Sequence, residues 1–269
     1  MTKETDKAQR QSLRGDCAAA FLLLSRIPVT WHRFPEDRPP DFTSSLWAFP
    51  VVGLVIGAVA GGTLALTEIA MLPPLVSAAV GLLVLALLSG AMHEDGLADM
   101  ADGFGGGRDV ESKIRIMHDS RIGSYGVMAL ILSSAVRLGL LMACLDAFDG
   151  LQLVMFIAFI QAASRFQPVA QLSAFSISPH ASLAHLTGQP GTLRLIVGAL
   201  IWLLPLAWLI GVTTTLMMAM PVVALTLWIG SLAMRQIKGL TGDVMGATTI
   251  IGEIALLACW ASLARLVPA

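Results

Sequence analysis

The stretch LWAFPVVGLVIGAVAGGTLALTEIAML, Leu46–Leu72, contains one charged residue, Glu68, and is otherwise almost wholly apolar. A helix needs about 20 predominantly apolar residues to cross the hydrocarbon core of a bilayer. The stretch is therefore long enough for one crossing, and its charge content is too low for a helix at a water-exposed surface. We predict a membrane span here.

The rest of the chain has the same character. Of its 269 residues, 56% are hydrophobic and 13% are charged, and the mean hydropathy is +0.77. Soluble domains typically carry about 25% charged residues. Counting apolar segments of sufficient length gives seven predicted spans, at Leu46–Leu72, Leu75–Met92, Val127–Cys144, Leu151–Phe175, Leu193–Val212, Leu216–Met234 and Thr248–Leu266. Ala18–Ile27 is too short to cross and is predicted to be a re-entrant or interfacial helix.

The predicted fold class is therefore all-α: a polytopic integral membrane helical bundle that forms one membrane-embedded domain over residues 1–269. A polar N-terminal tail covers residues 1–16, and a long polar loop covers residues 93–124. With the N-terminus inside, every Lys and Arg except Arg137 and Arg265 falls in or near a cytoplasmic segment. Because cytoplasmic loops are enriched in Lys and Arg, we predict an N-in, C-out topology.

The sequence does not support nucleic-acid binding, a disulfide framework or a zinc site. The net charge of −1 provides no positive field that would attract nucleic acid, so no nucleic-acid partner is predicted. Cys17, Cys144 and Cys259 are widely separated, and the five histidines show no metal-binding spacing. Neither a disulfide framework nor a zinc site is predicted.

The stretch SGAMHEDGLADMADGFGGG, Ser89–Gly107, places carboxylates directly after the second predicted span. If the helix continues, Asp95, Asp99 and Asp102 share one face, because they stand at i, i+4 and i+7. Like charges on one stripe repel unless a cation lies against them, and Mg²⁺ binds carboxylates together with phosphate oxygens and water. These three residues are predicted to bind Mg²⁺. The alternative is a helix end whose acids face water.

Two more polar segments precede predicted spans. IMHDSRIGSYG contains Asp119, Ser120 and Arg121, and an arginine guanidinium matches the geometry of phosphate oxygens. Its alternative role is a membrane anchor at a helix cap. KGLTGDVMGATTIIGE contains Thr241 and Asp243 and opens onto the last span, where the alternative is again a helix cap.

Ionisable residues also fall inside or beside the predicted spans. Arg137, Arg165 and Glu253 stand where a charge is costly and usually faces the bundle interior. Pairing of Arg137 with Glu253 would give them a purely structural role. His93 adjoins the acidic stretch and is a candidate general base, a neighbour of the metal or an interfacial histidine.

Five blocks of the sequence together resemble the cobalamin 5′-phosphate synthase family, also called adenosylcobinamide-GDP ribazoletransferase. They are LLLSRIPV, FPVVGLVIG, HEDGLADMADG, IMHDSRIGSYG and LTGDVMGATTIIGE. They occur in the family's order between Leu22 and Glu253, so the resemblance spans nearly the whole chain. Two residues depart from the family pattern: Glu94 stands at a usually apolar position, and His118 at a usually basic one.

The resemblance implies a Mg²⁺-dependent transferase of the cell inner membrane, with residues 93–124 as a cytoplasmic active-site loop. Such an enzyme joins adenosylcobinamide-GDP to α-ribazole or its 5′-phosphate and releases GMP, late in cobalamin biosynthesis. The implied partners are these substrates, the lipid bilayer and other enzymes that assemble the nucleotide loop.

The resemblance also implies roles for individual residues. Asp95, Asp99 and Asp102 would bind one or two Mg²⁺ ions. The proton acceptor would be Asp99, His93 or Asp119. The residues that would hold the substrates are Arg26, Ser120, Arg121, Arg165, Thr241 and Asp243.

Two other functions compete with this one. CDP-alcohol phosphotransferases also place an Asp-rich helix at the cytoplasmic face, but their D-G-x-x-A-R pattern ends in Arg, whereas the segment DGLADM of this chain, Asp95–Met100, contains Asp99 and no Arg. A cation transporter would place its acids near mid-membrane on broken helices, whereas Asp95–Asp102 follow the end of a predicted span. The residues therefore favour the corrinoid transferase.

Overall fold

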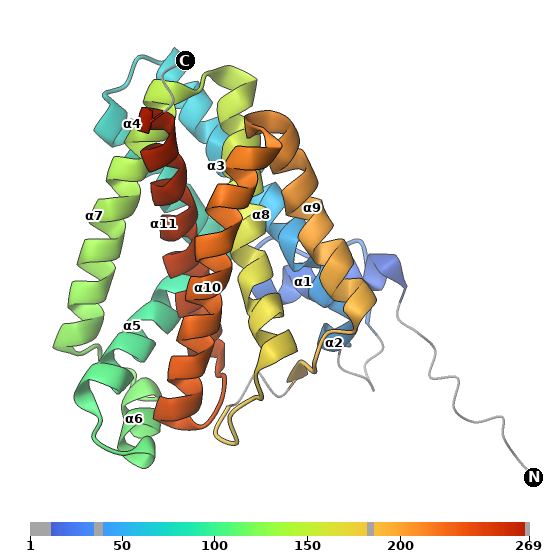
Figure 1. Cartoon of the computed structure of the whole chain (residues 1–269), viewed down its shortest axis with the longest axis vertical. Coiled ribbons are helices and arrows are strands. Elements are labelled where there is room, and N and C mark those ends of the chain that lie inside the picture. The colour runs from blue at the N-terminus through green and yellow to red at the C-terminus, as the bar shows by residue number, and fades with distance from the viewer. Residues whose placement is uncertain (1–11, 35–39, 182–185, 267–269) are drawn as a thin grey trace, which may run out of the picture.

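The computed structural model describes residues 12–34, 40–181 and 186–266, and Figure 1 shows their arrangement. Within these ranges the chain is helical, and the only β-pairing is one isolated bridge between Ile177 and Leu240. The elements are α1 (Leu13–Leu24), α2 (Phe42–Ser45), η1 (Leu46–Ala48), α3 (Phe49–Ile69), α4 (Pro74–Ser89), α5 (Met92–Gly106), α6 (Val110–Met117), α7 (Ser124–Ala147), α8 (Gly150–Ala174), α9 (Thr192–Ile210), α10 (Val212–Ile237) and α11 (Gly242–Leu266). The predicted all-α class is confirmed.

The described helices also match the predicted number of spans. Six stretches are long and apolar enough to cross a membrane, or seven if α4 and α5 together form one bent span. The predicted short N-terminal helix is present as α1, which has 12 residues. Of the predicted polar tail, residues 1–11 lie outside the described residues, and α1 already begins at Leu13.

The second predicted span ends differently from the prediction. Helix α4 stops at Ser89, and α5 starts at Met92 with its axis turned by 89°. Gly90 and Ala91 both adopt the left-handed conformation, with φ of 67° and 54°, and this breaks the helix. The acidic stretch is thus a separate helix rather than a continuation of the span.

The most extensive helix pair is α3 and α8, which pack along one another through small residues. Gly53, Gly57 and Gly61 recur every fourth residue of α3 and face the α8 backbone. A Cβ atom on Gly57 would lie 2.7 Å from the Cα of Ala158. Because small residues let helix backbones approach closely, this stripe places α8 in the centre of the bundle.

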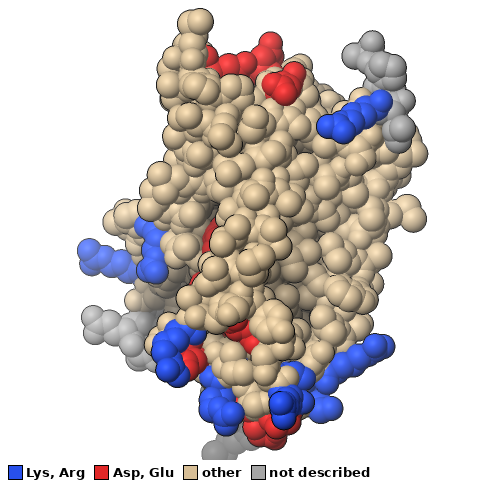
Figure 2. All heavy atoms as spheres, turned by 90° about the vertical axis from the view of Figure 1, so that its left-hand side faces the viewer, with Lys and Arg blue, Asp and Glu red and all other residues tan. Residues whose placement is uncertain are grey.

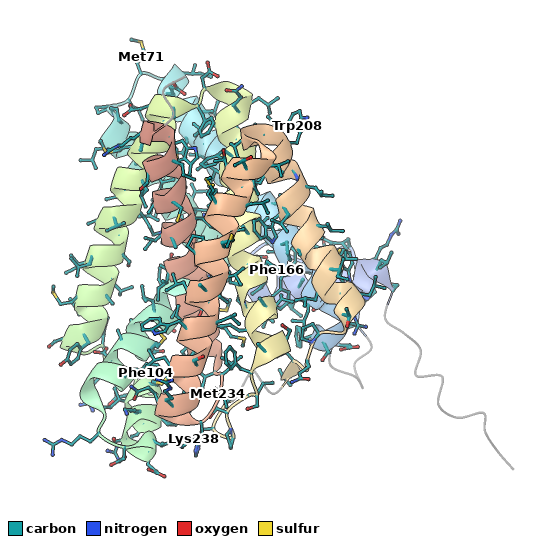
Figure 3. The ribbon with its side chains drawn as sticks, viewed as in Figure 1. Met71, Phe104, Phe166, Trp208, Met234 and Lys238 are labelled. Atoms are coloured by element: carbon teal, nitrogen blue, oxygen red, sulfur yellow. The ribbon has the colours of Figure 1, made fainter. Side chains whose placement is uncertain are left out.

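Charged side chains mark the two ends of the bundle. Met71, in the turn between α3 and α4, lies at one end, and Lys238, after α10, lies at the other (Figure 3). On the face shown in Figure 2, basic side chains gather at the end formed by α5 and α6, whereas the opposite end shows mainly acidic ones. Arg108, Lys113 and Arg115 lie on or beside α6.

We predict that Gly57→Ala destabilises the protein by about 1–3 kcal/mol, because a methyl group at this position overlaps the α8 backbone. Thermal unfolding of the purified protein in detergent measures the change. The matched control is Gly62→Ala, since a Cβ atom there meets nothing within 4 Å. Equal stability of the two variants would contradict the close α3–α8 contact.

Candidate functional site

A pocket of about 200 Å³ lies where α5, α8 and α11 meet, with α1 and α3 contributing to its wall. Its polar lining includes His93 and Asp95 from α5, Arg165 from α8 and Asp243 from α11. These four residues are all among the predicted site residues, and they are separated by up to 150 positions in the sequence. The fold therefore brings a substantial part of the predicted site into one pocket.

Two glycines let α5 and α11 approach closely beside this pocket. A Cβ atom on Gly96 would lie 2.8 Å from the backbone oxygen of Asp243, and one on Gly246 would lie 3.4 Å from the Cα of His93. Gly96 directly follows Asp95 in α5. The acidic segment of α5 is consequently held against the first turn of α11.

The start of α11 is fixed by hydrogen bonds to a loop that follows α8. Ser178 donates its backbone N–H to the oxygen of Leu240 at 2.9 Å, and Leu240 donates to the oxygen of Ser176 at 3.0 Å. The Thr241 hydroxyl accepts the Val244 N–H at 3.3 Å. Thr241 is buried and caps α11, so the alternative role considered for this segment is present in the structure.

The carboxylates of α5 differ in their surroundings. Asp95 is exposed, Asp99 is half-buried and Asp102 is buried. Asp99 interacts electrostatically with Asp95, Asp102 and Asp243. Among the described residues, no Lys or Arg forms an ion pair with Asp95, Asp99 or Asp243. This part of the site therefore concentrates carboxylates without an ion pair to Lys or Arg among the described residues.

Both carboxylate oxygens of Asp102 accept hydrogen bonds from backbone N–H groups at the start of α7. One carboxylate oxygen accepts the N–H of Gly123 at 2.7 Å, and the other accepts the N–H of Gly126 at 2.9 Å. These groups belong to the first turn of α7, where helix N–H groups lack partners of their own. Asp102 thus caps α7 and joins it to α5.

Asp119, Ser120 and Arg121 lie in the loop between α6 and α7, outside the pocket lining. Arg121 donates to both oxygens of Asp119, at 3.1 Å and 2.7 Å, and its side chain is 86% exposed. These hydrogen bonds lower the pKa of the Asp119 carboxyl to about 2. Ser120 is also exposed.

Arg26 lies at the break between α4 and α5, also outside the pocket lining. Its backbone N–H donates to the oxygen of Leu88 at 2.7 Å, and its side chain packs over Gly90. Arg26 therefore supports the turn that reorients α5.

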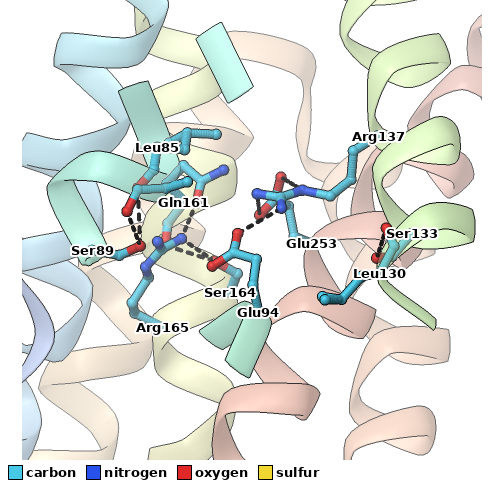
Figure 4. A network of polar contacts seen from close by, with 11 residues as sticks. Leu85, Ser89, Glu94, Leu130, Ser133, Arg137, Gln161, Ser164, Arg165 and Glu253 are labelled. Carbon is cyan, nitrogen blue, oxygen red and sulfur yellow. Dashed lines mark hydrogen bonds and ion pairs between the residues drawn. The ribbon is translucent and has the colours of Figure 1, made fainter. Parts of the chain in front are cut away.

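A buried ion-pair network lies next to the pocket (Figure 4). Arg137 donates to both oxygens of Glu253, at 3.0 Å and 3.1 Å, so the structure contains the pair considered from the sequence. Its Nη1 also donates to Glu94 at 2.8 Å. No partner of Glu94 was predicted from the sequence; in the structure Glu94 lies in the first turn of α5, one residue before Asp95. The network joins α5, α7 and α11.

Arg165 adjoins this network and is 3% exposed. Its Nη1 donates to the Ser164 hydroxyl at 3.0 Å and to the Gln161 side chain. Its Nε has no hydrogen-bond partner among the described residues, although it is buried. One donor of this pocket-lining guanidinium is therefore buried without an acceptor among the described residues.

The apolar wall of the pocket was not predicted from the sequence. It is formed by side chains of α1, α3, α5, α8 and α11, namely Leu24, Phe49, Met92, Pro168, Leu172 and Met245. Each of these resembles an ordinary core or lipid-facing residue in its own helix. Only the packing of the helices shows that they surround one space.

The chain is similar in sequence to proteins of one known family over most of its length. The family model of cobalamin-5-phosphate synthase matches residues 16–261. Proteins named adenosylcobinamide-GDP ribazoletransferase are similar to the chain over most of its length. The one from Azorhizobium caulinodans is 40% identical, with 90% of this chain and 93% of the relative covered. The one from a Sinorhizobium species is 36% identical, with 90% and 94% covered.

A third relative of the same name, from Brucella anthropi, is 33% identical, with 93% of this chain and 97% of the relative covered. No solved structure matches the chain. The family match covers almost all of the described helices, including the three, α5, α8 and α11, that supply the polar lining residues named above. The chain therefore belongs to the cobalamin-5-phosphate synthase family.

Proposed function

We propose that this protein is an adenosylcobinamide-GDP ribazoletransferase, which joins adenosylcobinamide-GDP to α-ribazole or α-ribazole 5′-phosphate and releases GMP. The observation that carries the proposal is the pocket that gathers Asp95, Arg165 and Asp243 in a chain matched by this family over residues 16–261. The same match supports this activity over a CDP-alcohol phosphotransferase and over a cation transporter.

The reaction is a displacement at phosphorus in which a ribose hydroxyl attacks the phosphate attached to the corrinoid. Because the acceptor is proposed to serve with or without a 5′-phosphate, the attacking hydroxyl is not the one at the 5′ position. Such displacements need positioning and charge neutralisation more than covalent help from the protein. The pocket has carboxylates that can bind a charge-neutralising cation, and a buried guanidinium that can position a substrate group.

A divalent cation fits the donor set, and we propose Mg²⁺. Asp95, Asp99 and Asp243 are hard oxygen donors without a described ion-pair partner. Among the residues described, no three His, Cys, Asp or Glu side chains converge closely enough to hold a metal ion by themselves. Mg²⁺ commonly uses only one or two carboxylates, with substrate phosphate and water completing its coordination. When bound, it would neutralise charge on the pyrophosphate.

The chain's own residues would divide the remaining tasks. Asp95 and Asp243 would hold the metal at the pocket, with Asp99 beside them. Asp102, predicted as a third ligand, would instead position α5 through its hydrogen bonds to α7. His93 is the only one of the three predicted acid–base residues that lines the pocket, so it is the best placed to accept a proton.

Residues outside the pocket would contact the outer parts of a large substrate. Arg26, Ser120 and Arg121 are exposed but do not line the pocket. They are therefore accessible only to portions of the corrinoid nucleotide that extend beyond it. Thr241 would act through its cap of α11, which carries Asp243.

We further propose that the α5–α6 end faces the cytoplasm and that the protein resides in the inner membrane. The support is the concentration of basic residues at this end (Figure 2) and the known bias of Lys and Arg toward cytoplasmic loops. Side chains such as Trp208 and Met220, each 74% exposed, would contact lipid. Other enzymes of nucleotide-loop assembly are proposed as partners at the cytoplasmic surface.

The activity is tested with purified protein in nanodiscs, supplied with adenosylcobinamide-GDP, α-ribazole and Mg²⁺. We expect equimolar GMP and cobamide by chromatography, and loss of both products when EDTA replaces Mg²⁺. Absence of product from folded protein with either form of the acceptor would overturn the proposed function. Product formation that EDTA leaves unchanged would overturn the metal requirement alone.

Asp95→Asn is expected to lower kcat/KM at least about a hundredfold, because it removes a proposed metal ligand worth several kcal/mol in the transition state. The initial rate of GMP release measures the effect over a series of Mg²⁺ concentrations. The matched control is Glu68→Gln, an exposed carboxylate at the end of α3, which should retain full activity. Full activity of Asp95→Asn at limiting Mg²⁺ would contradict the assignment.

Asp119→Asn is expected to change kcat/KM by less than about tenfold and to leave the pH–rate profile between about pH 5 and pH 9 unshifted. Because Arg121 holds the pKa of Asp119 at about 2, this carboxylate is already ionised throughout that range and would be a weak base. The pH dependence of GMP release is the measurement. A displaced acidic limb in the variant would instead identify Asp119 as the proton acceptor.

A further inference from the structure

The pocket is asymmetric in its chemistry. Asp95 and Asp243 lie in the lining, and Gly242 beside them is exposed. Most of the remaining wall is apolar and comes from Leu24, Phe49 and Met245 together with neighbouring side chains. Leu24 is 6% exposed and Phe49 is 4% exposed, so this part of the wall lies inside the bundle. The pocket thus combines carboxylates with an apolar chamber.

The wall of the chamber also includes a buried hydrogen-bond donor of Arg165 without a described partner. Arg165 lines the pocket, and its buried Nε has no acceptor among the described residues. The Thr249 hydroxyl, also in the lining, already donates to the Met245 oxygen at 3.0 Å. A buried donor left without an acceptor costs about 1–3 kcal/mol. A ligand that fits this chamber would be largely apolar and would offer an acceptor atom to Arg165.

The substrates of the proposed reaction present three large groups to such a space. The corrin ring and its side chains are too large for a pocket of about 200 Å³. Guanine carries several donors and acceptors, and burying them against apolar side chains would leave most of them unpaired. The base of ribazole, 5,6-dimethylbenzimidazole, is a flat bicycle with two methyl groups and a single free acceptor nitrogen.

We propose that the apolar chamber binds the benzimidazole base of the ribazole substrate, with the Arg165 Nε–H donating to its free ring nitrogen. This assignment rests on the proposed function and deepens it by naming the group that the pocket selects. It places the ribose toward Asp95 and Asp243, where the proposed phosphoryl transfer occurs. It also gives Arg165 a role in recognising the base rather than the phosphate.

The proposed hydrogen bond from Arg165 is tested by changing the riboside substrate, while the protein remains wild-type. Wild-type protein is supplied with the α-riboside of benzimidazole or of indole, which has the same shape but carries a C–H in place of the acceptor nitrogen. We expect kcat/KM for the indole riboside to be at least about tenfold lower, because the Arg165 donor remains unpaired. Equal use of the two ribosides would overturn the contact with Arg165.

The chamber wall is tested with Met245→Phe, which reduces the space, and Met245→Ala, which enlarges it. Met245 is half-buried and has no proposed chemical role. A single methylene in an apolar pocket changes kcat/KM about tenfold or more. We therefore expect Met245→Phe to disfavour the dimethylbenzimidazole riboside relative to the unsubstituted benzimidazole riboside about tenfold. Met245→Ala should reverse this preference, with the KM for adenosylcobinamide-GDP unchanged in both variants.

Met142→Phe is the matched control, because Met142 is also half-buried but lies in α7 away from the pocket. It should keep the wild-type base preference. Altered KM for adenosylcobinamide-GDP with an unchanged base preference in the Met245 variants would show that the chamber holds the other substrate, and would overturn the inference. That result would leave the proposed function intact, whereas absence of GMP release from wild-type protein with every riboside would remove both.

Discussion

The guanidinium of Arg137 sets the constraint on which the arrangement of the site depends. It is 2% exposed in a helix that is long and apolar enough to cross a membrane, where an unpaired charge is costly. Two carboxylates satisfy it, Glu253 through both oxygens and Glu94 through one. Removing one partner from such a cluster typically costs more than the pair contributes, because the other charge remains buried. Helices α5, α7 and α11 are therefore fixed relative to one another.

The orientation of α5 follows from that constraint together with the helix break before it. Left-handed residues at Gly90 and Ala91 turn the chain by 89°, and Glu94 then anchors the first turn of α5 to Arg137. Asp102 anchors the last turns to the start of α7. With both ends held, Asp95 lines the pocket and Asp99 lies half-buried one turn further along α5, and neither forms an ion pair among the described residues. A helix with low intrinsic hydrophobicity is thereby kept inside an apolar bundle.

Much of the fold could be predicted from the sequence, because span length and apolar composition are local properties. Pairing of Arg137 with Glu253 was also accessible, since buried charges in a membrane need partners. The break at residues 90–91 was not predicted, because a single glycine such as Gly90 is compatible with a continuous helix and Ala rarely takes the positive φ that Ala91 has. The spacing of Asp95 and Asp99 predicted that they share one face of a helix. Which part of the bundle that face meets depends on the helix break at residues 90–91.

The pocket was only partly predictable for a different physical reason. His93, Asp95, Arg165 and Asp243 were singled out because charged and polar residues are rare in this chain. The residues of the apolar wall could not be singled out in this way, because Leu24 and Met245 resemble the other apolar residues of their helices. Asp102 was predicted to be a metal ligand, but its hydrogen bonds to Gly123 and Gly126 could not be predicted because they depend on the approach of two helices.

The pairing of Arg137 also has a consequence for the order in which the protein is made. Glu94 precedes Arg137 by 43 residues, whereas Glu253 follows it by 116. As the chain leaves the ribosome, Arg137 enters the bilayer with Glu94 already synthesised and Glu253 still to come. Glu94 can neutralise the nascent helix during this interval, and the arrival of the last helix then closes the network. Of the two carboxylates that pair with Arg137, Glu94 is therefore the one already present in the chain when Arg137 is synthesised.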